Sequence, residues 1–322
     1  MKIHRHTILM TAVLSGVAMS SLAQTVPARV LTRNAKSAVE VVLTGRNNGT
    51  LHAKLATAEA GAINIEAADV ESVRFELDGA KIGMAENAVR ANKVSDAVRY
   101  YREAVAPALS YLDLPLNNAI QPAFRYAELL RLRGMWGESI KVYRALQSAP
   151  DAAVRNEALA WDAYALTRQR EFETAKGIVD NLKLDDPRER GFTAASIAQA
   201  RIALSRNQDE NALDWSSRAA ALSRLENGLY PEALMLTAEC YERLGRKAPV
   251  ALRDSAVVRD DGSAPRELPL TAEQFAGVVE SVYSQITNLF PSAEQAAIAA
   301  DRLAAATNQT VHPVLRGSVS GE

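Results

Sequence analysis

The sequence is poor in the residues that carry disulfides, metal sites and covalent catalysis. Cys240 is the only cysteine among 322 residues, so no intrachain disulfide can form. His52 and His312, the two histidines beyond residue 23, are not at metal-ligand spacing. G-x-S-x-G, His-Glu-x-x-His and a phosphate-binding glycine loop are also missing. We therefore expect no cofactor, no metal and no enzyme activity. The missing motifs do not exclude an enzyme that uses ordinary carboxylates, but no residue pattern supports one.

Aromatic content and net charge are low as well. Aromatics make up 6% of the chain, whereas hydrophobic residues make up 48% and alanine is abundant. This composition predicts a sizeable core of closely packed helices. The formal net charge is only −1. A nearly neutral surface offers no electrostatic attraction to nucleic acid or to an anionic membrane, so we expect neither as a partner.

Residues 1–23 have the pattern of a Sec-type signal peptide. A basic start with Lys2 and Arg5 precedes an apolar run at 8–19, and Ser21-Leu22-Ala23 offers a small-x-small cleavage site. The apolar run is shorter than the ~20 residues that a spanning helix needs, which disfavours the alternative of an uncleaved anchor. No cysteine lies near the cleavage site, so the lipoprotein pattern is missing. We predict a periplasmic protein, with secretion as the alternative, and no stable membrane insertion after cleavage.

Residues 28–79 are predicted to form a small β module. Apolar and polar residues alternate in four short segments, and Asn48-Gly49 between the first two is a strong hairpin signal. The V-x-V-x-L pattern with its Asn-Gly turn resembles the small Sm-like or SH3-like barrels. RNA binding, which an Sm-like barrel would imply, is disfavoured because the chain is expected to be exported and the strands carry no basic cluster. The favoured role is docking, and the expected strands are 38–44, 50–57, 62–66 and 69–77.

From about residue 81 onward the apolar period changes from two to about three and a half, and the sequence repeats itself. A small residue recurs early in the second helix of each predicted pair, and another stands twelve positions before it. Two antiparallel helices approach closely only where such small side chains meet. The later set is Ala97, Ser139, Ala175 and Ala212, and the earlier set is Ala85, Ala127, Ala163 and Ala200.

The later anchors are 42, 36 and 37 residues apart, and the units resemble tetratricopeptide (TPR) repeats, whose period is 34, with loop insertions. The stretch VYSQITNLFPSAEQAAIAADRL (282–303) resembles a terminal repeat of TPR proteins of the bacterial envelope, with one helix ending at Phe290-Pro291 and Ser292 capping the next. Thr271 and Gln274 predict a capping box for the first of these helices. The resemblance implies a mainly α fold, a TPR-like α-solenoid of helix pairs after the β module. Its expected parts are repeats at 81–258, a loop at 259–270, terminal helices at 271–306 and a flexible tail at 307–322.

Such repeats imply a concave face lined by the first helix of each pair, and a non-catalytic scaffold that binds another envelope protein or a peptide segment there. The competing interpretation is a small-ligand or glycan-binding protein that uses the helical groove or the β module. Such a site needs clustered aromatics, and three tryptophans in separate repeats argue against it. For the aromatic candidates packing between repeats is favoured over binding, charged candidates can equally form a solvated face, and Trp136 at the turn of the second unit is a candidate surface contact. The residues expected to bind the partner are Arg125, Glu128, Arg131, Trp161, Asp162 and Tyr164.

Overall fold

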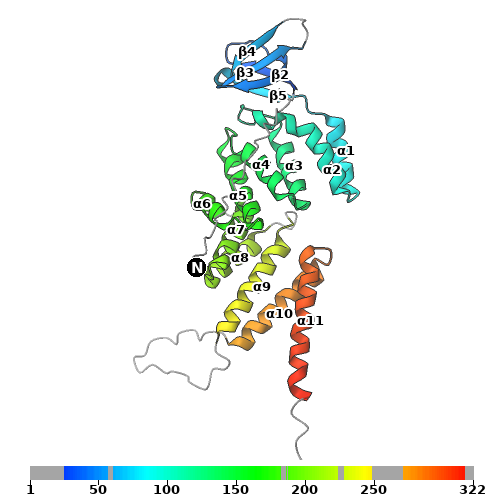
Figure 1. The fold of residues 1–322 in the computed structure, drawn as a ribbon, viewed down its shortest axis with the longest axis vertical. Coiled ribbons are helices and arrows are strands. Elements are labelled where there is room, and N and C mark those ends of the chain that lie inside the picture. The colour runs from blue at the N-terminus through cyan, green and yellow to red at the C-terminus, as the bar shows by residue number, and fades with distance from the viewer. Residues whose placement is uncertain are drawn as a thin grey trace, which may run out of the picture.

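The protein is mainly helical, with an antiparallel sheet at its N-terminal end. The computed structural model describes residues 25–56, 61–182, 186, 188–223, 228–248 and 271–315, with side chains up to residue 306. Within these ranges, a five-stranded sheet precedes eleven α-helices, which follow one another along the long axis (Figure 1). The expected signal peptide and the expected loop at 259–270 lie outside the described residues. No described helix is both long and apolar enough to cross a membrane.

All four expected strands are present, and the structure adds a fifth at the front. The strands are β1 (Val26–Thr32), β2 (Val39–Asn47), β3 (Thr50–Leu55), β4 (Ala62–Glu66) and β5 (Val70–Phe75), in the sheet order β4-β3-β2-β1-β5. The unpredicted β1 pairs with both β2 and β5, so it lies inside the sheet rather than at an edge. Asn48 and Gly49 both have positive φ, as the predicted Asn-Gly hairpin turn requires.

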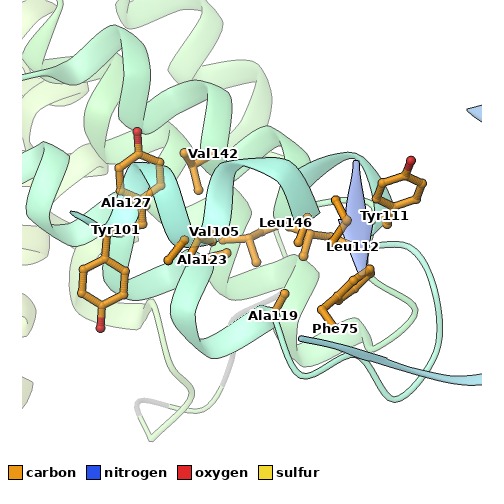
Figure 2. Packing of buried hydrophobic residues seen from close by; sticks show 14 of the residues in the cluster. Phe75, Tyr101, Val105, Tyr111, Leu112, Ala119, Ala123, Ala127, Val142 and Leu146 are labelled. Carbon is orange, nitrogen blue, oxygen red and sulfur yellow. The ribbon is translucent and has the colours of Figure 1, made fainter. Parts of the chain in front are cut away.

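The sheet packs directly on the helical part, and Phe75 at the end of β5 makes the junction. Its ring lies 6.1 Å from that of Tyr111, in the 3-10 helix η2 (Ala106–Tyr111), and both belong to one apolar cluster that continues into the helices (Figure 2). The Asn118 side chain accepts a hydrogen bond from the Phe75 N–H (2.8 Å) and donates one to the Phe75 carbonyl (3.0 Å). These contacts anchor the β module to the helices that follow it.

Consecutive helices pack against one another in the order of the sequence. The first eight are α1 (Gly79–Arg90), α2 (Val94–Val105), α3 (Ile120–Leu132), α4 (Trp136–Leu146), α5 (Ala152–Arg168), α6 (Phe172–Val179), α7 (Phe192–Ser205) and α8 (Asp209–Leu222). The last three are α9 (Tyr230–Lys247), α10 (Ala272–Leu289) and α11 (Glu294–Leu315). All eight small anchors predicted from the repeat are fully buried between these helices. The burial expected of these small residues is therefore confirmed.

The same turn joins the two helices in each of the first four pairs. A residue with positive φ stands five positions before each later anchor, and the N–H that follows it bonds the carbonyl five residues back. This is the 6→1 hydrogen bond of a Schellman motif, which ends a helix with a left-handed residue. The four left-handed residues are Asn92, Gly134, Arg170 and Asn207. The sequence repeat is thus matched by a repeat of local backbone geometry.

The C-terminal helices agree with the prediction in part. Thr271 and Gln274 form the expected capping box, and α10 ends at Leu289, next to Phe290. The next helix begins at Glu294, so Ala293 rather than Ser292 precedes it, because one more residue is needed to complete the turn. The tail expected from residue 307 is also corrected, since α11 continues to Leu315; the alanine-rich run before Thr307 favours continued helix.

Candidate functional site

An aromatic cluster lies where α3, α4 and α5 meet. Trp161 on α5 stacks on Tyr143 of α4, with ring centroids 6.2 Å apart and an interplanar angle of 12°. Trp161 also meets Tyr164 edge-on at 5.7 Å, and Tyr164 in turn meets Trp136 at 6.0 Å. Offset and edge-to-face pairs of this kind are the favoured aromatic geometries. The cluster forms a rigid wall that joins two adjacent helix pairs.

Two arginines lie over this aromatic wall. The Arg131 guanidinium of α3 lies 5.0 Å from the Trp161 ring and 6.0 Å from the Tyr164 ring. The Arg168 guanidinium of α5 lies 5.0 Å from the Trp136 ring. A guanidinium over an indole face is attracted by the negative face of the ring and keeps its N–H donors free at the edge. The wall therefore combines apolar surface with positive charge.

Glu232 on α9 is the negative centre next to this wall. It is buried, and its Oε2 accepts a hydrogen bond from the Tyr164 hydroxyl at 2.7 Å. Arg201 of α7 donates to Oε1 from Nε (3.1 Å) and Nη2 (2.8 Å), and Arg168 lies 3.8 Å away. A buried carboxylate is tolerated when several donors satisfy it in this way. Glu232 thereby holds α5, α7 and α9 in one arrangement.

Three adjoining cavities, which we call the inner groove, open along these helices. A cavity of 260 Å³ between α3 and α5 shares Arg131 with one of 680 Å³ that extends to the turn between α10 and α11. The first also shares Glu157 and Trp161 with a cavity of 200 Å³ at the start of α7. Shared lining residues make the three spaces neighbours. The inner groove is therefore one surface, and the first helices of several pairs contribute to it.

Arg125 and Glu128, the next candidates, line the groove as members of an ion-pair network. Arg125 donates to Glu86 of α1 (3.1 Å) and to Glu128 (2.6 Å). The Arg125 guanidinium lowers the pKa of the Glu86 carboxyl, and a hydrogen bond from Tyr101 acts in the same direction. These partly exposed pairs add little to stability. Because Glu86 and Glu128 both pair with Arg125, the positive charge of Arg125 is already neutralised.

Asp162 does not line the inner groove, which corrects the prediction for this residue. Its side chain is buried against α4, where Gln147 donates to Oδ2 at 2.8 Å and Arg144 lies at 3.4 Å. Burial raises the pKa of the Asp162 carboxyl, and these two donors counter the shift. The reason is helical geometry, because Asp162 follows Trp161 by one residue and points about 100° away from it around the helix. The role of Asp162 is structural.

The predicted residues thus divide into three placements. Arg125, Glu128, Arg131 and Trp161 line one cavity, Tyr164 lines the neighbouring one with Arg131, and Asp162 faces away. Trp136 and Trp161 stand in separate repeats, as noted from the sequence, but both contact Tyr164 and so belong to one aromatic cluster. Trp136 accordingly belongs to the wall of the groove rather than to a separate surface contact.

Sequence reasoning missed Arg168, Glu232, Glu157 and Tyr143. Glu232 lies 68 residues from its partner Tyr164. A usable signal existed for Arg168, because it stands four residues after Tyr164 on the same face of α5. Glu232 carries no local signal, since only the packing of α9 on α7 brings it to the site.

Exposed leucines line the rim of the inner groove. Leu132 at the end of α3 is 55% exposed and Leu289 at the end of α10 is 61% exposed, and both line the 680 Å³ cavity. Leu222, which is 41% exposed, lines the 200 Å³ cavity. They are three of the seven large apolar side chains exposed in the described parts of the chain. Apolar side chains gathered at a cavity mark a surface suited to a partner.

A further cavity of 460 Å³ lies between α9, α10 and α11, and its lining is more apolar. Its central polar groups are engaged with one another, since Tyr283 and Arg302 both donate to Glu242 at 2.6 Å. Specific recognition needs polar groups that can turn to a ligand. The inner groove, where charge and apolar surface are both presented, is therefore the stronger candidate site.

The described residues contain no group of three or more His, Cys, Asp or Glu side chains arranged to hold a metal ion. Cys240, the lone thiol, is buried beside Ser216, and burial raises its pKa to about 11. It packs as a small apolar residue.

No protein-family model matches the sequence, and no curated protein matches it.

Proposed function

We propose that this chain is a non-catalytic, TPR-like scaffold of the periplasm. In this proposal it binds an extended peptide segment of another envelope protein in the inner groove. One observation carries the proposal: exposed leucines and stacked aromatic rings line a groove that also presents arginine and glutamate side chains. An extended peptide offers apolar side chains for the first set and charged or backbone groups for the second. The peptide is the occupant that uses both.

The TPR-like α-solenoid is part of this proposal, and the repeated helix-pair geometry supports it. Four pairs share the same left-handed turn and have buried small residues at the same positions. Helix pairs stacked in this way form an extended inner surface that binds peptides or helices of a partner. The inner groove lies on the first helices α3, α5, α7 and α9, which matches that expectation.

Periplasmic location rests on the signal-peptide pattern at residues 1–23. The β module is proposed as a second docking contact of the Sm-like or SH3-like kind. Its five antiparallel strands and its fixed junction at Phe75 suit a module that is held in place rather than tethered loosely. The partner contacted by the sheet would then lie at a set distance from the inner groove.

Site-specific photocrosslinking in the producing cells tests the proposal. A photoreactive amino acid replaces Leu132 or Leu289 in the groove, and Leu116, which is 81% exposed and lines none of the three groove cavities, serves as the matched control. We expect both groove variants to capture the same envelope protein through one short segment, and the Leu116 variant not to capture it. A synthetic peptide of the mapped segment should bind the wild type and bind L132D more weakly. Equal capture from all three positions, or capture of this chain alone, would overturn the proposal.

A second candidate is a small-ligand or glycan-binding protein that uses the same groove. The observation that favours it is the aromatic cluster of Trp136, Tyr164, Trp161 and Tyr143, since sugar rings and flat ligands pack on such faces. A ligand that binds only the folded state raises the melting temperature, and the rise increases with the logarithm of its concentration once that exceeds the Kd. A thermal-shift screen with oligosaccharides and small metabolites distinguishes the two, because a large shift with one of them would favour this candidate.

A further inference from the structure

Arg131 differs from the other arginines that lie over aromatic rings. Four such arginines occur in the described part of the chain. Three of them have a carboxylate within 4.0 Å, whereas Arg131 has none among the described residues. The three paired arginines are Arg99 with Asp96, Arg168 with Glu232, and Arg218 with Asp214. Arg131 therefore carries a positive charge without a local counter-ion.

Arg131 is also the most deeply buried member of this set. Only 8% of the residue is exposed, and its Nε finds no hydrogen-bond acceptor among the described residues. A buried charge without partners is unfavourable, because it loses its hydration and gains no hydrogen bond in return. The Trp161 ring offsets only part of this loss. A group kept under these conditions is expected to serve binding.

Carboxylates that line the same cavities as Arg131 are paired with other residues. Glu128 pairs with Arg125 at 2.6 Å, and Glu157 lies 4.0 Å from Arg190. Burial raises the pKa of the Glu157 carboxyl. Glu232 is saturated by the Tyr164 hydroxyl and two other arginines, and Glu294, which also lines the 680 Å³ cavity, forms no ion pair with Arg131. The space in front of Arg131 is thus left for an anionic group from outside.

We propose that Arg131 receives a carboxylate of the peptide segment bound in the inner groove, an inference that rests on the proposed function. Arg131 lines both the 260 Å³ and the 680 Å³ cavities, so a ligand in either one can reach it. The planar guanidinium binds a carboxylate through two parallel N–H donors, and the Trp161 face holds the guanidinium plane in position. Leu132 and Leu289 on the rim of the larger cavity accept an apolar side chain next to that carboxylate.

The carboxylate has two sources, an acidic side chain or the C-terminus of the segment, and three blocked dipeptides separate them. Acetyl-Leu-Leu carries a terminal carboxylate, acetyl-Asp-Leu-amide carries only a side-chain carboxylate, and acetyl-Leu-Leu-amide carries neither. Each is titrated into the full mature protein while the tryptophan indole and Arg131 Nε–H resonances are followed by NMR. We expect one of the acids to shift the Trp161 and Arg131 signals at concentrations at least about tenfold lower than the amide, as for a hydrogen bond to a charged group. Equal responses to all three, or no response to any, overturn the inference.

Substitution of Arg131 separates binding from packing. R131M keeps the length and apolar contacts, and we expect at least about a tenfold loss of acid binding with a melting temperature equal to or above that of the wild type, since an unpaired buried charge is removed. The matched control is R218M, which removes another arginine from above a tryptophan but should leave acid binding unchanged. A lower melting temperature for R131M with unchanged acid binding would make Arg131 a packing residue and overturn the inference.

If R131M does not fold, R131K tests whether Arg131 binds the carboxylate. It retains the charge and loses the pair of parallel N–H donors, so we expect weaker acid binding at an unchanged melting temperature. Full acid binding in R131K would contradict the proposed geometry.

The two proposals also fail in different ways. If photocrosslinking captures one partner segment but acids bind no better than the amide, the peptide groove stands and the role of Arg131 falls. If photocrosslinking captures no partner, the proposed function falls first.

Discussion

Gly191 holds α7 against α5 at a distance that only glycine allows. It precedes the first residue of α7 with φ = 89°, and a Cβ at this position would lie 2.8 Å from the Ala160 Cβ and 3.2 Å from the Glu157 Cα. Both residues belong to α5, and Glu157 lines the inner groove. We therefore expect Gly191→Ala to displace α7 from α5 and to destabilise the protein.

The size of the effect has two parts. The left-handed φ is strained for alanine by ~1 kcal/mol. The steric overlap, mostly with atoms of a packed helix that cannot swing away, adds ~1–3 kcal/mol, as for other overpacked sites. Gly49→Ala is a matched control, because Gly49 has φ = 86° and no atom within 4 Å of its ideal Cβ. It should show the φ term alone.

Urea denaturation followed by circular dichroism measures both variants. We expect the free energy of unfolding to fall by ~2–4 kcal/mol for G191A and by ~1 kcal/mol for G49A, with unchanged slopes. Peptide capture from Leu132 should also weaken in G191A, since α7 supports one wall of the groove. If G191A were no less stable than G49A, the close packing of α7 on α5 would be wrong, and the 200 Å³ cavity with it.

Three further predictions follow from buried and capping groups. Burial raises the pKa of Asp162, so above the ordinary aspartate pKa of 3.8 the folded state still binds a proton that the unfolded state has lost. The stability of the wild type should therefore fall relative to that of D162N as the pH rises above 3.8. Urea midpoints measured at a series of pH values check this. Cys240, with its pKa raised to about 11, should react with a thiol reagent near roughly pH 8 only after denaturation, which absorbance of the released chromophore reports. T271A removes the capping box of α10 and should lower the free energy of unfolding by about 1 kcal/mol in the same urea assay, with T287A as a control.

Local periodicity accounts for what the sequence could predict. Four strands, the Asn-Gly hairpin and the small anchors of the helix pairs all arise from residues within one or two turns of each other, and all are found in the structure. Strand β1 was missed although Val26, Ala28 and Val30 alternate, because this short run directly follows the expected cleavage site and has no turn signal before it. The helix at 307–315 was missed because polar residues interrupt its periodicity.

The candidate site was predicted only in outline. Arg125, Glu128, Arg131 and Trp161 follow from the expectation that the first helices line a groove, and they do share a cavity. Asp162 faces away from this cavity because it stands one position after Trp161 on α5. Which of the two faces the cavity depends on how α4 and α5 cross, and composition does not report this. The aromatic wall depends on contacts between the successive helices α4 and α5, and Glu232 on contacts with helices distant in sequence; no pattern within one helix indicates either.

Asp162 and Arg131 show why burial alone does not identify a binding residue. Both are charged, both are more than nine-tenths buried, and each has one side-chain atom without a hydrogen-bond partner among the described residues. Asp162, however, is held by Gln147 and Arg144 across the contact between α4 and α5, so its charge contributes to that contact. Arg131 lies over the Trp161 and Tyr164 rings, forms no ion pair within the described residues and lines two cavities. What separates the two residues is their surroundings: Asp162 is held by donors from α4 and its C-terminal end, whereas Arg131 has no carboxylate partner among the described residues and lines two cavities that a partner can enter.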